Sequence, residues 1–264
     1  MSLIDTHCHI YSTEFAPDLS SMIARALSQD ITTMLMPAID SSTHSAMHTV
    51  EDAFQGNCLS MMGLHPCSVK ANFRQELEIV EDYFSRRRFI GVGETGLDFY
   101  WDLTFKAEQC IAFEQQIDWA IHYDVPVVIH SRNSIDECIK IINEKQNGNL
   151  KGVFHCFSGS LEQARRIIDL NFHLGIGGVL TYKKSGLEAV LSQIDLNKIV
   201  LETDSPYLAP VPFRGKRNEC SYLRYIAEKL AEVKQLTLTE VAAITTQNTR
   251  RLFNLDNLGY TRAK

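Results

Sequence analysis

Short runs of strand-forming composition recur along the chain, and a polar segment with apolar residues at helical spacing follows each of them. The strand-like runs cover residues 2–10, 32–39, 58–65, 89–96, 125–131, 151–158, 172–178 and 198–205. The helix-like segments cover residues 17–29, 42–55, 73–87, 105–123, 133–146, 160–169, 183–193, 219–235 and 238–253. This pattern predicts eight strands that alternate with helices, followed by two terminal helices.

Eight strand–helix units over about 250 residues are typical of a (β/α)8 barrel, the TIM barrel. A doubly wound open sheet is the alternative α/β architecture. Such a sheet usually has fewer strands and a glycine-rich phosphate loop after its first strand, and this sequence has no such loop. We find no linker, repeat or low-complexity segment, so we expect one domain spanning residues 1–264.

Polar side chains interrupt the apolar runs at their carboxyl ends. In a TIM barrel those ends converge on one face, where the active sites of such enzymes lie. Residues that are far apart in the sequence are therefore expected to meet there. They are His7, His9, His65, Glu94, His130, His155, Glu202 and Asp204.

The first strand-like run carries alternating polar residues. Asp5, His7 and His9 share one face of an extended chain, and Cys8 points to the other side. A single pair of histidines spaced in this way is common, but matching groups at the ends of five strands are not. Buried carboxylates and imidazoles in such number are costly unless a cation compensates them. The set therefore predicts a metal site, with enough donors for two ions that share a bridging carboxylate.

Four other histidines are expected to have no part in this site. His44 and His48 have the i, i+4 spacing of a zinc-binding helix, but the acid of the HExxH motif is absent. We interpret them as part of a solvated helix face. His122 and His173 lie near a helix end and a strand start, at the bottom of the barrel, and are predicted to be structural.

Composition limits the partners and the compartment. The net charge of −6 gives no long-range attraction for DNA, so binding of nucleic acid would need a local basic patch. The seven cysteines are odd in number and form no CxxC pair, which argues against a disulfide framework or a zinc finger. There is no secretory signal and no apolar run of membrane-spanning length, so we expect a cytoplasmic protein without a membrane partner.

Seven short motifs occur in a fixed order, and together they resemble a known family. They read "DTHCHI", "GLHP", "VGETGLDFY", "VVIHSR", "FHCFSGS", "ETDSPYLAP" and "RGKRNE". The set is similar to that of the TatD family of metal-dependent deoxyribonucleases, in the amidohydrolase-like superfamily. The resemblance extends from residue 4 to "NTRRLF" at 248–253. It implies a TIM barrel, two divalent metal ions and hydrolysis of DNA, commonly from 3′ to 5′ on single strands.

The resemblance also implies which residues bind the metal ions. The metal ligands of the family match His7, His9, Glu94, His130, His155 and Asp204. We expect Glu94 to bridge the two ions, with His7, His9 and Asp204 on one ion and His130 and His155 on the other. Such mixed imidazole and carboxylate donors do not select one metal. The family suggests Mg²⁺ or Mn²⁺ for activity, and Zn²⁺ also suits imidazole.

Three groups are assigned to catalysis. They are Glu94, Asp204, which is placed to accept a proton from water, and His65, which matches a family position near the substrate phosphate. Asp5 and Glu202 are expected to orient the imidazoles, with pairing to an Arg or Lys as the equally weighted alternative.

Basic residues after the strands are predicted to bind the phosphates of DNA. They are Arg132, Arg214, Lys216 and Arg217. Aromatic residues of the same loops are available to stack on bases or to pack on the barrel rim. They are Tyr100, Trp101, Tyr207 and Phe213. Many family members have a proline at the position of Cys220 and a histidine at that of Phe213, so these two departures bear on substrate preference.

Two other functions fit the same pattern. One is a two-metal amidohydrolase or esterase that acts on a small molecule. Related barrels of that kind often bridge their metals with a carboxylated lysine on the fourth strand, where this chain has Glu94. The other is a barrel without catalytic activity that binds a partner, against which the intact ligand set argues. No obligate protein partner is evident, and DNA is the expected substrate.

Overall fold

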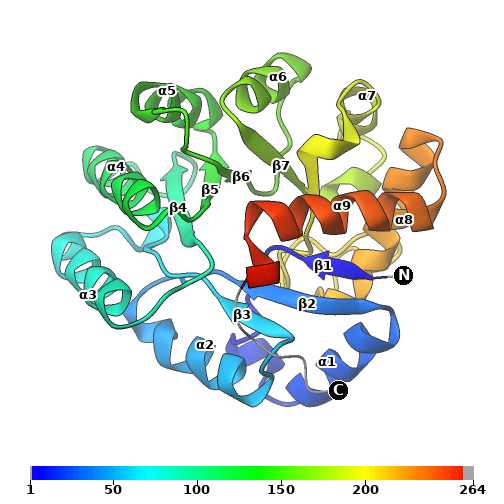
Figure 1. The fold of residues 1–264 in the computed structure, drawn as a ribbon, viewed down its shortest axis with the longest axis horizontal. Helices are drawn as coiled ribbons and strands as arrows, with labels where there is room; N and C mark the ends of the chain where they lie inside the picture. Colours follow the sequence, from blue (N-terminus) through cyan, green and yellow to red (C-terminus); the bar gives the residue numbers. More distant parts are fainter. Residues whose placement is uncertain (1, 258–264) are drawn as a thin grey trace.

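The computed structural model describes residues 2–257, which fold into a barrel of eight parallel strands. This confirms the predicted TIM barrel (Figure 1). Each strand is short and almost wholly buried. The strands are β1 Leu3–Asp5, β2 Ile31–Met36, β3 Cys58–Ser60, β4 Val92–Asp98, β5 Val127–Arg132, β6 Gly152–Phe154, β7 Phe172–Ile176 and β8 Ile199–Leu201.

Backbone hydrogen bonds join two sheets, β1–β2–β3 and β4 through β8, into one closed barrel. At one seam, the amide of Gly93 donates to the carbonyl of Met62 at 2.9 Å. At the other seam, the amide of Thr6 donates to the carbonyl of Leu201 at 3.0 Å. The second seam places the segment after β1 directly beside the segment after β8, and both segments carry predicted metal ligands.

The outer layer of the barrel consists of helices that follow the strands (Figure 1). They are amphipathic: in α3, for example, Phe73, Leu77, Val80 and Phe84 recur at helical spacing and are buried. Within residues 2–257 the helices are α1 Leu19–Ser28, α2 Ser41–Ala53, α3 Phe73–Arg86, α4 Lys106–Tyr123, α5 Ile135–Lys145, α6 Leu161–Asp169, α7 Leu187–Leu191, α8 Leu223–Lys234 and α9 Leu238–Leu252. None of these described helices combines the length and apolar character that a bilayer crossing requires.

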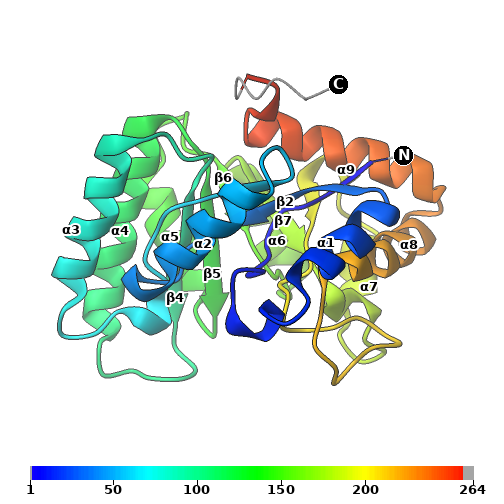
Figure 2. The same ribbon diagram turned by 90° about the horizontal axis from the view of Figure 1, so that it is seen from below.

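The interior of the barrel is filled near its amino-terminal end by one apolar cluster, which we name the lower barrel layer. Its members come from most of the strands and from the end of α9, which packs across this end against β1 and β8 (Figure 2). The lower barrel layer consists of Ile4, Leu35, Leu59, Met61, Ile90, Val128, Val153, Val200, Leu252 and Phe253.

Several elements are shorter than the sequence predicted, among them β1 and α7. β1 ends at Asp5, so His7 and His9 lie in the segment that follows the strand. The segment predicted as a helix at 183–193 is helical only at Leu187–Leu191, after Gly186 with a φ of 72°. A left-handed backbone at this glycine turns the chain before the helix begins.

The prediction that His44 lies on a solvated helix face is wrong. His44 is 1% exposed, and its ring meets Tyr83 of α3 edge-on with 5.2 Å between the ring centres. His44 shares its face of α2 with buried Met47 and Val50, so this face packs inward. Burial lowers the pKa of His44 to about 4.

Candidate metal centre

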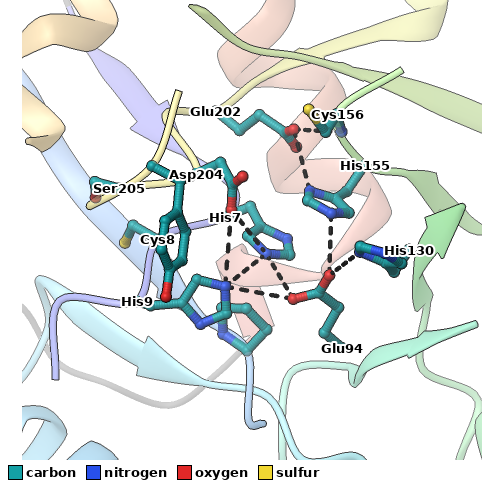
Figure 3. Close-up of polar contacts among 12 residues, drawn as sticks. His7, Cys8, His9, Glu94, His130, His155, Cys156, Glu202, Asp204 and Ser205 are labelled. Carbon is teal, nitrogen blue, oxygen red and sulfur yellow. Dashed lines mark hydrogen bonds and ion pairs between the residues drawn. The ribbon is translucent and has the colours of Figure 1, made fainter. Parts of the chain in front are cut away.

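The carboxylate of Glu94 lies at the centre of the residues predicted as ligands. Its Oε2 atom is 3.0 Å from Nε2 of His7 and 3.3 Å from Nε2 of His9. Its Oε1 atom is 2.9 Å from Nδ1 of His130 and 3.0 Å from Nε2 of His155. Figure 3 shows one oxygen facing each pair of imidazoles. The two oxygens therefore divide the nitrogens into two groups, as a bridging carboxylate would.

Asp204 completes the first group. Its Oδ1 atom lies 3.7 Å from Nε2 of His7 and 3.8 Å from Nε2 of His9 (Figure 3). The amide of Asp204 donates to the carbonyl of His7 at 2.9 Å, which fixes the two segments to each other. The φ of Asp204 is 56°, a left-handed conformation that few residues other than glycine adopt. With this backbone conformation, the carboxylate of Asp204 lies toward His7 and His9. Uncommon backbone conformations of this kind cluster at functional sites.

The remote ring nitrogens of two of these histidines have fixed partners. Nδ1 of His9 is 2.9 Å from the hydroxyl of Tyr11, which itself donates to the carbonyl of Pro37 at 2.6 Å. His9 must therefore donate from Nδ1, which leaves a lone pair on Nε2 facing Glu94. Nε2 of His130 is 2.8 Å from Oδ2 of Asp98, so the neutral ring carries its lone pair on Nδ1, although Asp98 and Glu94 also raise its pKa. Both rings thus present an acceptor nitrogen to the centre, as a metal ligand must.

Glu202 stands behind the ring of His155. Its Oε1 atom lies 3.3 Å from Nδ1 of His155 and accepts a hydrogen bond of 2.5 Å from the amide of Cys156 (Figure 3). Gly175 makes room for this carboxylate, because a Cβ atom at position 175 would lie 2.3 Å from Oε2 of Glu202. Glu202 is therefore placed to orient an imidazole, as the sequence suggested.

Asp5 has a different place from the one expected. Its carboxylate accepts hydrogen bonds from the amide and the hydroxyl of Thr203, at 2.9 and 2.6 Å, and from the amide of His7 at 3.3 Å. It contacts no imidazole in these hydrogen bonds. Asp5 thus orders the backbone on both sides of the seam between β1 and β8, and the ring of His7 is oriented by other contacts. Burial raises the pKa of Asp5 to about 7.

His65 also reaches Glu94 but presents the opposite kind of nitrogen. Its Nε2 atom lies 3.3 Å from Oε1 of Glu94. Its Nδ1 atom accepts a hydrogen bond of 3.0 Å from the amide of Cys67. The proton of a neutral His65 ring must therefore be on Nε2, which points into the site as a donor. His65 fits the role of a hydrogen-bond donor to an oxyanion and does not fit that of a metal ligand.

The electrostatics follow from close packing of these groups away from water. Burial raises the pKa of Glu94, but the surrounding imidazoles, those of His65 and His155 foremost, outweigh it and hold this pKa well below its usual range. Burial raises the pKa of Asp204 to about 6, although His155 and His9 oppose the shift. Burial and the neighbouring His155 lower the pKa of His7 well below its usual value. The rings of His7 and His155 stack with centres 3.8 Å apart, where two charged rings would repel.

This donor set fits divalent metal ions. Among the described residues, the ion-pair partners of Glu94 are all histidines, and His9 and His130 face it with a lone pair when their rings are neutral. A lone pair that faces a carboxylate oxygen at 3 Å is unfavourable without a cation between them. Imidazole nitrogens and carboxylate oxygens in this mixture suit Zn²⁺ and Mn²⁺ and admit Mg²⁺.

A cavity of about 1050 Å³ opens above the metal centre at the carboxyl ends of the strands. Three of the four predicted phosphate-binding residues line it, namely Arg132, Arg214 and Lys216. The guanidinium group of Arg132 lies 4.0 Å from the ring centre of Tyr100 and 5.1 Å from that of Trp101. Contacts of this kind hold the guanidinium in place and leave its N–H groups free for an anion.

Arg217 lies outside this cavity, contrary to the prediction for it. Its guanidinium donates to both carboxylate oxygens of Asp18, at 2.7 and 2.9 Å, and its charge is therefore already paired. Phe213 likewise stacks on Tyr222, with ring centres 4.0 Å apart and an angle of 5° between the planes. Trp101 and Tyr207 remain 67% and 53% exposed and line the cavity, where bases can reach them.

Two residues of the site were missed in the sequence. Asp98 and Tyr11 fix the rings of His130 and His9, and neither was assigned a role. Alternation along the chain could have found both of them. Asp98 follows Glu94 by four positions within β4, and Tyr11 continues the series that begins with Asp5.

Known proteins share both this sequence and this fold. The sequence model of the family described as TatD related DNase matches residues 4–254. The uncharacterized metal-dependent hydrolase YabD of Bacillus subtilis is 34% identical over 96% of this chain and 100% of its own length. The uncharacterized metal-dependent hydrolase YcfH of Escherichia coli K12 is 30% identical over 97% of each chain.

A solved structure agrees with these relatives. The crystal structure of YjjV, a TatD homologue from Escherichia coli K12, superposes with a TM-score of 0.90 and 29% identity over 96% of this chain and 98% of its own. The matches cover the whole barrel and all of the residues around Glu94. This chain therefore belongs to the TatD-related DNase family of metal-dependent hydrolases.

Proposed function

We propose that this protein hydrolyses phosphodiester bonds at the ends of single-stranded DNA, in the 3′-to-5′ direction, with two divalent metal ions. One observation carries the proposal. Glu94 presents its two oxygens to two separate groups of nitrogens at the floor of a cavity, and the cations of Arg132, Arg214 and Lys216 line that cavity. A protein with a net charge of −6 has little other reason to gather cations around buried acids.

The ligands divide between the two ions as the oxygens of Glu94 divide the histidines. His7, His9 and Asp204 would hold one ion, His130 and His155 the other, and Glu94 both. When bound, the ions supply positive charge against the phosphate and lower the pKa of a water molecule. We expect Mg²⁺ or Mn²⁺ to support activity, and the donors also admit Zn²⁺.

The reaction requires a proton acceptor on one side of the phosphorus and a donor on the other. Asp204 would accept the proton of the attacking water, since its carboxylate lines the cavity within 4 Å of His7 and His9. His65 donates from Nε2 to a phosphate oxygen or to the leaving oxygen, because Cys67 fixes its other nitrogen as an acceptor.

The cavity positions the end of the strand. Arg132 and Arg214 bind phosphates in this proposal, each held over an aromatic ring, and Lys216 adds a third charge. Trp101 and Tyr207 offer exposed rings on which bases stack, with no need for a particular sequence. The description of the matched family as DNase supports DNA as the substrate. The seven free cysteines are consistent with a cytoplasmic location.

The test is the release of nucleotides from end-labelled single-stranded oligonucleotides with Mn²⁺ or Mg²⁺. We expect stepwise shortening from the 3′ end, lost in Glu94→Gln and kept in Glu228→Gln, a change in an exposed ion pair on α8. A parallel panel of small esters and amides addresses the alternative. Turnover of one of these without any hydrolysis of DNA would replace our proposal with an amidohydrolase or esterase.

A further inference from the structure

The rim of the cavity is built unevenly, and one side of it holds cations without acidic partners. This side, which we name the cationic rim, comprises residues 178–186 after β7 and 206–216 after β8. It carries Lys183 and Lys184, both exposed, next to the cavity-lining Arg214 and Lys216. None of these four forms an ion pair with any described residue, whereas Lys229 of α8 pairs with Glu188 at 3.1 Å.

The two segments of the cationic rim form one unit. The hydroxyl of Tyr182 donates to the carbonyl of Ala209 at 2.9 Å, and the amide of Val211 donates to the hydroxyl of Thr181 at 2.9 Å. A Cβ atom at Gly178 would lie 2.1 Å from the carbonyl oxygen of Leu208, so the two backbones are in direct contact. In Figure 2 these loops project at the end of the barrel opposite to α9.

Arg214 links the cavity to the outer part of this rim. Its guanidinium lies 4.4 Å from the ring centre of Tyr182, the residue immediately before Lys183. Lys183 and Lys184 therefore follow in the chain directly after the residue on which the guanidinium of Arg214 lies.

On two other sides of the rim, cations are paired with acids, although Arg132 and Lys106 lie over aromatic rings and form no ion pair with a described residue. Beyond β4, Lys70 is paired with Asp102 at 3.0 Å. Near α1, Arg217 is paired with Asp18 at 2.7 Å, and Arg25 pairs with the same acid at 2.9 Å. A polyanion that left the cavity past Lys70 or Arg217 would meet cations whose charge a carboxylate already neutralises. The cationic rim is the favourable exit.

We infer that the part of the DNA strand beyond the cavity leaves it over residues 182–186, where Lys183 and Lys184 each bind a phosphate. This inference rests on the proposed function and deepens it, because it assigns a second, outer binding site for the strand. A substrate of two or three nucleotides fills only the cavity, and a longer strand also uses the two lysines. Affinity should therefore rise with strand length, through contacts that depend on salt.

The experiment measures binding by fluorescence anisotropy across a series of salt concentrations. The probes are a labelled 20-nucleotide and a labelled 3-nucleotide single strand, both with phosphorothioate links that resist hydrolysis. The variants are Lys183→Ala/Lys184→Ala and, as a matched control, Arg88→Ala/Lys140→Ala, which removes two exposed cations away from the cavity. Loss of two phosphate contacts should reduce the slope of log K against log salt by about 1.4 for the 20-nucleotide strand.

The measurements distinguish a failure of the outer site from a failure of the proposed function. The inference is supported if the double lysine variant loses this slope on the long strand, loses far less on the short one, and the control behaves as wild type. An unchanged slope in a variant that still binds and degrades DNA overturns the outer site and leaves the proposed function standing. Wild-type protein that neither binds nor degrades either strand overturns both.

Discussion

The two ends of the barrel are built from the same strands but differ in almost every physical respect. The lower barrel layer contains apolar side chains and is covered by α9. The opposite end holds His7, Glu94, His155 and Glu202, all nearly inaccessible to water, under an open cavity. In β5, Val128 belongs to the lower barrel layer and His130, two positions later, to the metal centre. Along β5, the apolar lower barrel layer and the polar metal centre are thus only two residues apart.

The two ends contribute to the free energy of folding with opposite sign. The lower barrel layer gains free energy by removing apolar surface from water. The metal centre loses free energy by burying acids and imidazoles, and recovers part of it through hydrogen bonds such as those of Asp98 and Tyr11. A change at one end should therefore act mainly on activity, and a change at the other mainly on stability.

The largest expected effect is that of Glu94→Gln. A glutamine side chain carries no negative charge, so it cannot bridge two cations as the carboxylate does. The rate of DNA hydrolysis should therefore fall by about 10³-fold or more. Elemental analysis should show fewer bound ions per chain. The variant also leaves the buried imidazoles without their counter-charge, so the free energy of unfolding of the metal-free protein should fall, by up to about 3–5 kcal/mol, and activity is compared per folded molecule. Wild-type metal content and activity in this variant would contradict the bridging role.

The second effect concerns the other end, in Leu35→Ala. Leu35 is 0% exposed within the lower barrel layer, so the truncation should cost about 2–5 kcal/mol of unfolding free energy. The metal ligands lie at the far end of the strands, and kcat per folded molecule should stay close to wild type. Denaturant unfolding and activity at low temperature measure the two quantities. A large loss of kcat with unchanged stability would show that the two ends are not separable.

Much of this organisation could be predicted from the sequence, because it depends on periodicity. Strand–helix alternation predicts the barrel, and the position of a polar residue at a strand end predicts that it meets the others. The structure brings His7, His9, Glu94, His130, His155 and Asp204 together as that argument requires.

The remainder depends on contacts that a linear pattern does not contain. Arg217 follows Lys216 directly in the sequence, yet its guanidinium forms an ion pair with Asp18, which belongs to a distant segment of the chain. The absence of the HExxH acid suggested a solvated face for His44, whereas its ring packs against Tyr83 of α3. The assignment of His65 as a donor depends on one backbone amide, that of Cys67. Partners contributed by other segments decide each of these cases.

A smaller effect should follow from Asp98→Asn, which changes the partner of a ligand but no ligand. The amide group would present N–H to Nε2 of His130 and favour the tautomer with its proton on Nδ1, the nitrogen that faces Glu94. Metal affinity or activity should fall about 10- to 100-fold. Asp118→Asn, on the outer surface, is the control. Added Mn²⁺ should restore part of the lost activity; a fall in kcat that no metal concentration relieves would point to a different role for Asp98.

The smallest effect separates the pH dependence of the fold from that of the metal centre. The pKa of His44 is about 4 in the folded chain, because burial opposes its charge, and near 6.5 when unfolded. The unfolded chain therefore binds more protons between these values. Stability due to His44 is complete above pH 6.5 and is lost as the pH falls toward 4. His44→Phe should remove up to about 2 kcal/mol of the loss between pH 7 and pH 5.

The measurement compares the unfolding free energies of wild type and variant at each pH. Their difference cancels the contributions of the histidines in the metal centre, which both proteins share. The difference should vary with pH for His44→Phe. A flat difference for His44→Phe would assign the acid sensitivity of the protein to the metal centre alone.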